Sequence, residues 1–359
     1  MTRILQAMAG APVGGAEAFF TRLVPALTRA GQPQLAVVRT HAPRQKILQE
    51  AGVQTVALPF RGRPDFLTPW LFKKVVKRYR PEIVLTWMNR ATRAAPTGDW
   101  TLAARLGGYY DLKYYRHCDH LIGNTQDIRR YLIAKGWPEE RAWYLPNFVD
   151  ARVMPPVDKS TLQTPEEAPL ILCLGRLHKN KGFDVALNAL AQLPGAYLWI
   201  AGIGPEERAL KALADELGVT DRVRFLGWRA GVPALFAAAD IFLCSSRHEP
   251  LGNMVIEAWA QGVPVVAAAS QGPRQLIADG ETGLLAPVDD ADMLARQLAR
   301  VIETPSFGVD LAGKGHDAFQ KSYTEATVVA AYQEFFERVK PAAARASAPA
   351  QAPAGGAGT

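Results

Sequence analysis

The chain has 359 residues, of which 48% are hydrophobic and 21% charged, as is typical of a soluble globular protein, and its length favours two domains over one. No apolar run reaches the roughly 18 residues that a membrane-spanning helix needs, and Glu17 and Arg22 interrupt the start too early for a signal peptide. Three scattered cysteines without a CxxC pair argue against a disulfide framework or a zinc site and fit a reducing cytoplasm.

The charge is distributed unevenly along the chain. Residues 1–150 contain 22 Lys and Arg against 11 Asp and Glu, a net charge of +11, whereas the remainder contains 19 against 23, a net charge of −4. A strongly basic half of this kind indicates that one domain meets an anionic partner.

The first half alternates short apolar strands with helices. A strand at residues 3–8 is followed by the glycine-rich loop AGAPVGGAE at 9–17 and by a helix that ends at Gly31. Further strands are expected at residues 34–40, 53–59, 82–88 and 119–125, the last of them followed by a helix at 126–136. This alternation predicts a parallel sheet that is covered by helices on both faces.

The pattern restarts after residues 148–169, which are rich in proline and polar residues, as a domain boundary should be. In the second half, strands are expected at residues 169–177, 196–204, 222–228, 240–246 and 263–269, and helices at 183–193, 205–218, 231–239 and 254–262. We therefore expect two successive α/β units, at residues 1–150 and 168–323. Residues 341–359 are a run of small residues and are expected to be disordered.

Two glutamates in the stretch SSRHEPLGNMVIEAWAQGVPVVAA are the first candidate site residues. Glu257 lies one turn into a helix that follows a strand, and ligands of open parallel sheets bind just beyond such strand ends. The amino terminus of that helix offers free N–H groups to a phosphate, and Gly252 lets the backbone approach a ligand closely. Glu257 can accept hydrogen bonds from a pair of sugar hydroxyls, and Glu249 can reach a second group farther along the ligand.

A pair of cations follows another strand. In LGRLHKNKGFD, Arg176 lies just past the strand and Lys181 lies in the loop before the next helix, where cations can neutralise phosphate charge. Each of these charged residues also fits an ordinary surface position, but their combination favours a functional role. The GIG turn at Gly202–Gly204 fits a ligand site and a simple tight turn equally well.

The segments around these residues resemble the family 4 retaining glycosyltransferases, which have the GT-B fold. RHEPLGNMVIEAWAQGVPVVAA resembles the Glu-x7-Glu signature of the family, and LGRLHKNKGFDVALNAL resembles its diphosphate-binding segment. GGAEAFF, YLPNFVD, IAGIGPEERALKAL and VRFLGW also fall where the family has comparable stretches, so the resemblance extends to about residue 340. It implies an α/β architecture of two Rossmann-like domains facing across a cleft, with a helix at about 324–340 that crosses back to the first domain.

The resemblance also implies roles for the matching residues. Glu257 would hold the nucleotide ribose, Glu249 would contact the donor sugar, and Arg176 and Lys181 would bind the diphosphate. The other donor-side residues that it implies are Leu251, Gly252, Asn253, Gly14, Gly15 and Gly204. The donor would be a nucleoside-diphosphate sugar, UDP- or GDP-linked, with no further cofactor and no metal, because fixed cations and backbone donors stabilise the departing diphosphate.

The chain departs from the family at two places. Many relatives have Phe where this chain has Leu251, and many carry a His in the first domain, for which residues 101–120 (TLAARLGGYYDLKYYRHCDH) offer no clear counterpart. We therefore assign no catalytic His and take Arg105, Tyr109 and Asp111 as acceptor-side candidates.

These observations predict a retaining, metal-independent glycosyltransferase acting on a cell-envelope glycan or a lipid-linked acceptor such as the lipopolysaccharide core, and no nucleic-acid partner. Two alternatives remain open. A sugar-nucleotide epimerase of the same fold would share the nucleotide site, and a non-enzymatic protein that binds an anionic polymer would explain the basic half but not the two glutamates. A nicotinamide dehydrogenase is disfavoured, because AGAPVGG lacks the G-x-G-x-x-G pattern.

The segment Thr68–Pro81 combines aromatic and aliphatic residues with a cluster of cations. The cations are Lys73, Lys74, Lys77, Arg78 and Arg80, interleaved with Trp70 and Leu71. Such a segment fits a surface helix that packs on the sheet, a basic face against anionic lipid, or both. We accordingly expect a cytoplasmic enzyme that binds peripherally to the cytoplasmic face of the inner membrane.

Overall fold

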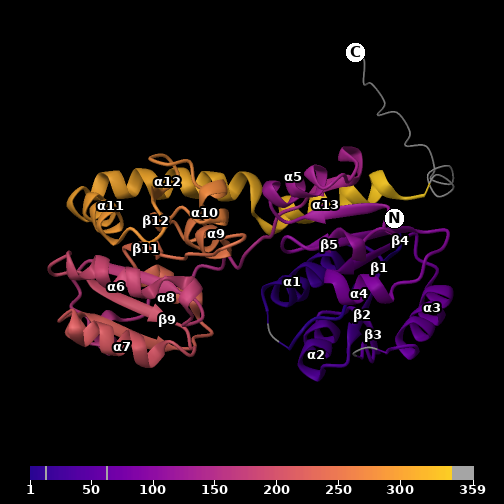
Figure 1. Cartoon of the computed structure of the whole chain (residues 1–359), viewed down its shortest axis with the longest axis horizontal. Coiled ribbons are helices and arrows are strands. Elements are labelled where there is room, and N and C mark those ends of the chain that lie inside the picture. The colour runs from indigo at the N-terminus through magenta and orange to yellow at the C-terminus, as the bar shows by residue number, and fades with distance from the viewer. Residues whose placement is uncertain (13, 62–63, 342–359) are drawn as a thin grey trace, which may run out of the picture. The chain divides into compact units, whose positions relative to one another are not determined.

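The computed structural model describes residues 1–12, 14–61 and 64–341 (Figure 1). Two compact units make up the chain, one formed by Met1–Leu145 with Val329–Thr359 and the other by Pro146–Val328. Each unit is built on a parallel sheet, so the predicted α/β class is confirmed. The tail that was expected to be disordered lies, from residue 342 onward, outside the described residues.

The first unit is built on seven strands in the order β3-β2-β1-β4-β5-β6-β7. These strands are β1 (Ile4–Met8), β2 (Gln34–Arg39), β3 (Gln54–Leu58), β4 (Ile83–Trp87), β5 (Thr101–Leu106), β6 (His120–Gly123) and β7 (Ala142–Tyr144). Every residue of β1, β4 and β5 is buried. Their nearly continuous apolar runs follow from this burial, because a parallel sheet covered on both faces has no solvent side.

Helices cover both faces of this sheet (Figure 1). They are α1 (Gly15–Arg29), α2 (Ala42–Glu50), α3 (Leu67–Tyr79), α4 (Met88–Ala94), α5 (Gln126–Ala134) and the part of α13 (Glu325–Val339) that belongs to this unit.

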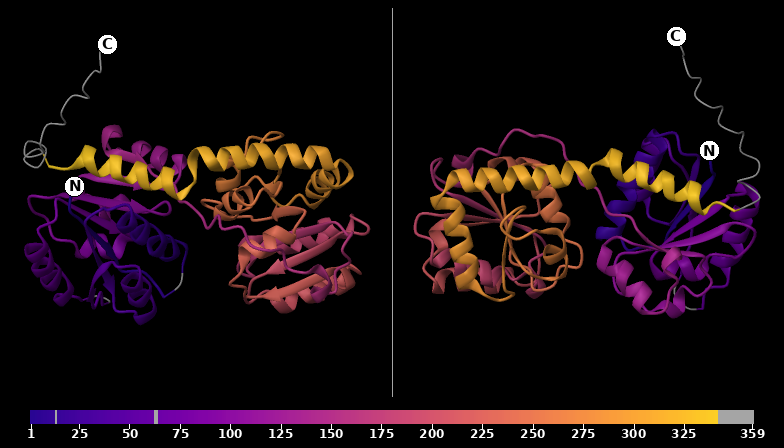
Figure 2. Two further views of the ribbon diagram at one scale, coloured as in Figure 1. Left: turned by 180° about the vertical axis from the view of Figure 1, so that it is seen from behind. Right: turned by 90° about the horizontal axis from the view of Figure 1, so that it is seen from above.

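Helix α13 runs beside the first sheet (Figure 2). It is hydrogen-bonded to strand β5 of that sheet and to Thr2, near the start of the chain. The hydroxyl of Thr101, at the start of β5, donates to the carbonyl oxygen of Val339 at 2.6 Å. The hydroxyl of Thr2 donates to a carboxylate oxygen of Glu337, also at 2.6 Å. The end of the described chain therefore completes the unit that the first residues begin.

Strand β5 was absent from the expected elements, because its sequence TLAARL contains two alanines and an arginine and therefore gives only a weak apolar signal. Its Arg105 is nevertheless 2% exposed. The guanidinium carbon lies 4.7 Å from the ring centroids of both Phe19 and Trp87, and Nε donates to the hydroxyl of Tyr332 at 2.8 Å. Two aromatic faces and a hydrogen bond thus replace the water that this cation loses on burial.

The second unit is built on six strands in the order β10-β9-β8-β11-β12-β13. These strands are β8 (Leu170–Leu174), β9 (Tyr197–Ala201), β10 (Val223–Gly227), β11 (Ile241–Cys244), β12 (Val265–Ala268) and β13 (Leu284–Ala286). The helices are α6 (Phe183–Ala191), α7 (Glu207–Glu216), α8 (Val232–Ala238), α9 (Asn253–Ala260), α10 (Gln271–Leu276), α11 (Ala291–Glu303) and α12 (Pro305–Ser322).

The sheet of the second unit separates two apolar cores. Successive residues of β8 point to opposite faces: Ile171 and Cys173 belong to one core, and Leu170, Leu172 and Leu174 belong to the other. This burial on both faces makes β8 a rigid base for the loop that follows it.

We predict that Tyr332→Phe destabilises the first unit. The substitution leaves the Nε–H of buried Arg105 without its hydroxyl partner, which should cost about 1–3 kcal/mol of unfolding free energy. Denaturant unfolding would measure this loss. Tyr79→Phe is the matched control, because the Tyr79 hydroxyl has no hydrogen-bond partner among the described residues. Equal stability of the two variants would contradict the role given to this hydroxyl.

Candidate functional site

The candidate site of the second unit lies where the strand order of its sheet reverses, between the hydrogen-bonded neighbours β8 and β11. Segments that follow two such strands turn to opposite sides of the sheet, and ligands bind in the crevice outside the strand ends. The segments here are residues 175–182, with Arg176 and Lys181, and residues 245–252, with Glu249. The tertiary structure therefore brings together residues that lie about 70 positions apart.

Lys181 and Glu249 form an ion pair, with 2.5 Å between Nζ and Oε2. Their side chains are only 20% and 13% exposed, so the pair is well shielded from solvent. The other carboxylate oxygen of Glu249 accepts a hydrogen bond from the backbone N–H of Gly252 at 3.3 Å. Glu249 thus holds the Lys181 ammonium group beside the turn that precedes α9. An anionic ligand can replace the Glu249 carboxylate as the partner of this ammonium group and of the Gly252 N–H.

Gly182 allows the two segments to touch. It has φ +63°, and a Cβ at this position would lie 2.2 Å from the carbonyl oxygen of Ser245. Any side chain would therefore push the segments apart. The contact is closed by two hydrogen bonds, from the Ser245 hydroxyl to the Lys181 carbonyl oxygen at 3.0 Å and from the His248 N–H to the Asn180 carbonyl oxygen at 3.1 Å.

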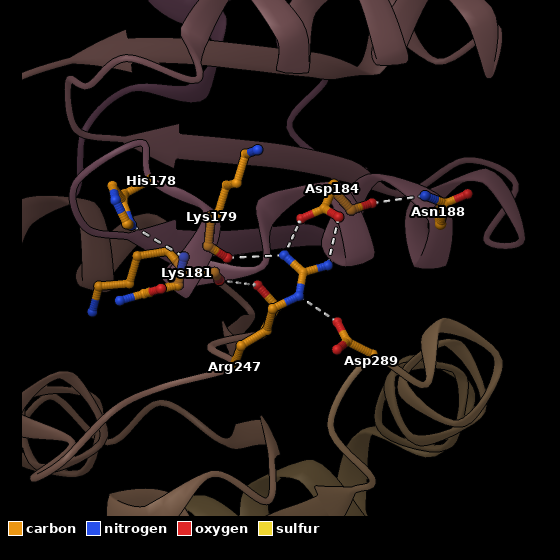
Figure 3. Close-up of polar contacts among 9 residues, drawn as sticks. His178, Lys179, Lys181, Asp184, Asn188, Arg247 and Asp289 are labelled. Carbon is orange, nitrogen blue, oxygen red and sulfur yellow. Dashed lines mark hydrogen bonds and ion pairs between the residues drawn. The ribbon is translucent and has the colours of Figure 1, made fainter.

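Arg247 ties the same segments together through its guanidinium (Figure 3). Nη1 donates to the Lys179 carbonyl oxygen at 2.9 Å and to Asp184 Oδ1 at 2.8 Å, and Nη2 donates to Asp184 Oδ2 at 2.6 Å. Nε donates to Asp289 Oδ1 at 2.5 Å. A bidentate arginine–carboxylate pair of this kind fixes orientation as well as distance.

The pKa of Asp184 reflects this contact. Partial burial raises it, but the hydrogen bonds and the positive charge of Arg247 outweigh burial and bring it below its ordinary value. The pKa of Arg247 is raised in turn, first of all by its hydrogen bonds to Asp184. The sequence analysis missed Arg247, although a cation two residues before Glu249 was a usable signal.

Arg176 and Glu257 are charged members of the predicted donor set that keep access to solvent. Arg176 is exposed and has no ion-pair partner among the described residues. Glu257 is half-buried, whereas Ile256 and Ala258 on either side of it are fully buried. The carboxylate in the apolar stretch therefore occupies one of the positions of α9, with Asn253 and Met254, that keep access to solvent, as a ligand contact requires.

The turn before α9 presents its backbone at the same edge of the sheet. Gly252 precedes the helix with φ +83°, and Leu251 is 9% exposed. The side chain of Asn253 accepts a hydrogen bond from Asn147 Nδ2 at 3.0 Å. Gly204 has a packing reason of its own, because a Cβ there would lie 2.2 Å from the Leu177 carbonyl oxygen.

The glycine-rich loop of the first unit follows β1, which adjoins β4 at the corresponding reversal of that sheet. A Cβ on Gly14 would lie 2.3 Å from Glu17 Oε2, whereas a Cβ on Gly15 would meet no atom within 4 Å. Glu17 is 8% exposed, and its Oε1 accepts a hydrogen bond from the Ala11 N–H at 2.8 Å. The buried carboxylate of Glu17 therefore contacts the loop backbone, a role that the sequence analysis missed. Gly15 is the position of the loop where a side chain would meet no other atom.

The three acceptor-side candidates have different surroundings. Arg105 is enclosed by aromatic rings in β5, as described above. Tyr109 is 39% exposed, its hydroxyl is hydrogen-bonded to Asp127, and its ring packs edge-on against Tyr131. Asp111 is exposed and accepts a hydrogen bond from the Lys113 N–H at 2.9 Å. Only Tyr109 and Asp111 of this set are accessible to a ligand.

Within the described ranges, no group of three or more His, Cys, Asp or Glu residues is arranged to hold a metal ion. None of the helices in the same part of the chain is both long and apolar enough to span a bilayer.

Comparison with known proteins identifies the family of this chain. Residues 156–316 match the family model "Glycosyl transferases group 1", and residues 13–153 match "Glycosyltransferase Family 4". The chain is 36% identical over 323 residues to the lipopolysaccharide core biosynthesis glycosyltransferase LpsE of Rhizobium meliloti (strain 1021), covering 89% of this chain and 94% of the relative. LpsD of the same organism is 34% identical, with coverage of 90% and 95%. The chain belongs to the family 4 glycosyltransferases.

Solved structures agree on the fold. Anabaena Alr3699/HepE in complex with UDP superposes with a TM-score of 0.82 at 21% identity, covering 94% of this chain and all of that one. WaaG, a glycosyltransferase involved in lipopolysaccharide biosynthesis, superposes with a TM-score of 0.68 at 19% identity, with coverage of 94% and 99%. The predicted GT-B fold and the predicted retaining glycosyltransferase activity are thereby confirmed for this family 4 enzyme.

We predict that Asp184→Asn flattens the acid limb of the stability curve. The folded-state pKa of Asp184 lies below its unfolded value, so the unfolded chain binds more protons in this range. Its contribution to stability is therefore complete above the unfolded pKa of about 4 and is lost as the pH falls through the folded pKa.

Unfolding free energies measured between about pH 5 and pH 2 would test this prediction. Asp221→Asn is the matched control, because Asp221 is exposed and its carboxylate has no partner in the described part of the chain. If Asp184→Asn and Asp221→Asn changed the slope equally, the Arg247 contact could not be the source of the shift.

Proposed function

We propose that this glycosyltransferase transfers a sugar from a UDP- or GDP-sugar to the lipopolysaccharide core or to a related lipid-linked acceptor. The observation that carries the proposal is its similarity to LpsE and LpsD over 89–90% of the chain, since both relatives act in lipopolysaccharide core biosynthesis. The likeness to HepE, which has been solved with UDP and with UDP-glucose, supports a uridine nucleotide as donor.

The donor binds, in this proposal, at the strand ends of β8 and β11. Glu257 accepts hydrogen bonds from the ribose, and Glu249 contacts the donor sugar. Arg176 and Lys181 bind the diphosphate, together with the backbone of Leu251, Gly252 and Asn253 at the start of α9. Gly14, Gly15 and Gly204 complete the set of donor-side residues. The support for these roles is the local geometry: an accessible arginine, a shielded lysine and a helix amino terminus at one edge of a sheet.

The proposed roles of the two cations follow from the charges that develop during sugar transfer. As the bond between the sugar and the diphosphate breaks, negative charge grows on the leaving diphosphate and positive charge grows on the sugar. Lys181 and Arg176 stabilise the leaving group more strongly in the transition state than in the ground state, which lowers the barrier. The acceptor hydroxyl attacks from the face that the diphosphate leaves, and the departing phosphate takes its proton.

A donor screen followed by a product assay tests the function. A nucleotide sugar present at 100 times its Kd should add roughly 2.7 kcal/mol to the unfolding free energy, which a thermal-shift screen detects. The selected donor is then incubated with and without lipopolysaccharide core oligosaccharide. Transfer that requires the oligosaccharide supports the proposal, whereas isomerisation of the donor sugar without any acceptor would show an epimerase instead.

We predict that Lys181→Ala lowers kcat on the order of 100-fold, because it removes a cation from the site of developing charge. Lys179→Ala is the matched control: it lies two residues away, is exposed, and contributes only its backbone carbonyl to the Arg247 contact. Single-turnover kinetics with the identified donor would measure both variants. Equal kcat values for Lys181→Ala and the wild type would remove Lys181 from the diphosphate site.

We further predict that Glu257→Gln weakens donor binding by about 1–3 kcal/mol, because a neutral amide is a poorer acceptor for ribose hydroxyls than a carboxylate. Calorimetric titration with UDP and with the identified donor would give the two affinities. Unchanged affinity for both ligands would contradict the ribose assignment.

The basic face of α3 supports binding to anionic lipid as a further part of the proposal. Thr68, Phe72 and Val76, spaced four residues apart, are the buried positions of this helix. Trp70 is 53% exposed, and the Lys74 ammonium lies 3.5 Å from its ring centroid. The exposed cations of the segment are Lys73, Lys74, Lys77, Arg78 and Arg80. An interfacial tryptophan among lysines suits a surface of anionic headgroups.

Binding to phosphatidylglycerol vesicles should therefore be reversible and should be lost at high salt, since headgroup attraction amounts to about 1 kcal/mol per Lys or Arg and is screened by salt. The triple reversal Lys73→Glu, Lys74→Glu, Lys77→Glu should abolish sedimentation with these vesicles. A matched reversal at three other exposed lysines, Lys135, Lys211 and Lys321, should retain most of it. Equal losses would assign the binding to net charge alone.

A further inference from the structure

A concavity of about 860 Å³ lies in the first unit, and none of its described lining residues belongs to the predicted donor set. Its walls come from the described residues between 60 and 69, which follow β3, and from residues 89–94 of α4, which follow β4. It therefore lies at the carboxyl ends of parallel strands, where α/β sheets bind ligands. Its volume falls within the range of about 300–1,000 Å³ that is usual for small-molecule sites.

Among the described residues of this lining, three arginines and one carboxylate are charged. Arg61, Arg90 and Arg93 are exposed and have no ion-pair partner among the described residues. The oxygens of Asp65 are engaged by backbone N–H groups, those of Arg61 at 2.8 Å and of Thr68 at 3.0 Å. The carboxylate therefore serves the loop. The Arg93 guanidinium carbon also lies 5.6 Å from the ring centroid of Tyr114, a contact with the flat face that leaves its N–H groups, like those of Arg61 and Arg90, available to an anion.

The backbone that carries these side chains is held in an unusual conformation. Phe60 and Met88, which follow β3 and β4, have φ +40° and φ +60°, values that residues other than glycine rarely adopt. Phe60 is fixed by a buried hydrogen bond from its N–H to the Thr68 hydroxyl at 2.9 Å and by edge-on packing against Phe72. Such strain persists where the surrounding structure determines it, and it gathers at functional sites.

Two neutral groups complete the pocket. Phe66 is 84% exposed, so its ring offers an apolar surface to a ligand. Asn89 accepts a hydrogen bond from the Tyr115 hydroxyl through Oδ1, and its amide nitrogen has no partner within the described residues. An apolar ring and an amide donor suit the carbon face and the hydroxyls of a sugar, and three guanidinium groups suit a dianion.

We propose that this pocket binds a phosphorylated sugar, with Arg61, Arg90 and Arg93 around the phosphate and Phe66 against the sugar ring. A phosphomonoester carries about −1.5 to −2 charges at neutral pH and presents three acceptor oxygens, which matches several arginine forks better than a carboxylate does. The proposal rests on the proposed function, because it makes this sugar phosphate part of the glycan acceptor.

A binding measurement that needs no transfer reaction tests the pocket itself. With the donor site saturated by UDP, glucose 6-phosphate, glucose and inorganic phosphate are titrated by calorimetry. The wild type should bind glucose 6-phosphate at least 10-fold more tightly than either of the others, and Arg61→Gln/Arg90→Gln should abolish this preference. The matched control Arg116→Gln/Lys135→Gln removes the same charge from exposed positions of the same unit and should keep it. The same affinity for all three probes, or the same loss in both double variants, overturns the proposal.

A kinetic measurement then tests the acceptor. The KM for lipopolysaccharide core oligosaccharide should rise at least 10-fold when its phosphates are removed with hydrogen fluoride, and by a similar factor in Arg61→Gln/Arg90→Gln. The two changes should not multiply, because they remove the same contact. Full multiplication overturns the proposal. Absence of transfer by the wild type would count against the proposed function, while the calorimetric result would still decide whether the pocket binds a sugar phosphate.

Phosphate could also be presented by a lipid headgroup, and vesicles separate the two sources. Arg61→Gln/Arg90→Gln and Arg116→Gln/Lys135→Gln should bind phosphatidic acid vesicles equally well. A selective loss in the pocket variant would assign these arginines to the membrane surface and overturn the sugar phosphate as their ligand.

Discussion

The close approach of the segments that follow β8 and β11 is the constraint on which the candidate donor site depends. Gly182 permits it, because a side chain there would collide with Ser245, and Arg247 maintains it through Lys179, Asp184 and Asp289. In the proposed function Lys181 must sit within a fraction of an ångström of its place, so the glycine contact and the arginine fork matter there as much as the residues proposed to meet the ligand.

The two units differ in how their cations are arranged. In the second, the shielded ion pair with Glu249 holds the Lys181 ammonium group in place. In the first, exposed guanidinium groups and the lysines of α3 carry the excess charge of +11 in residues 1–150. Such a surface attracts anions over about a Debye length, but attraction at this range does not fix their orientation.

The strands with strong apolar runs and the helices with clear stops were predictable from the sequence, because both faces of these sheets are buried. Strand β5 was missed, since an arginine in a strand normally signals exposure, whereas Arg105 is solvated by Phe19, Trp87 and Tyr332 from distant parts of the chain. Short β7 and β13 were missed as well, because three residues give no measurable period.

The sequence by itself determined the α/β class, the family and the identity of the charged residues, since these depend on local patterns and on motifs within single loops. Only the tertiary structure decided which charges are paired and which are open. Lys181 and Glu249 lie 68 positions apart in the sequence. They belong to two loops that meet only because β8 and β11 are neighbours in the sheet. Arg61 and Arg90 likewise line one pocket because β3 and β4 end at the same edge of the sheet. This proximity depends on the order of the strands, which a local sequence pattern does not specify.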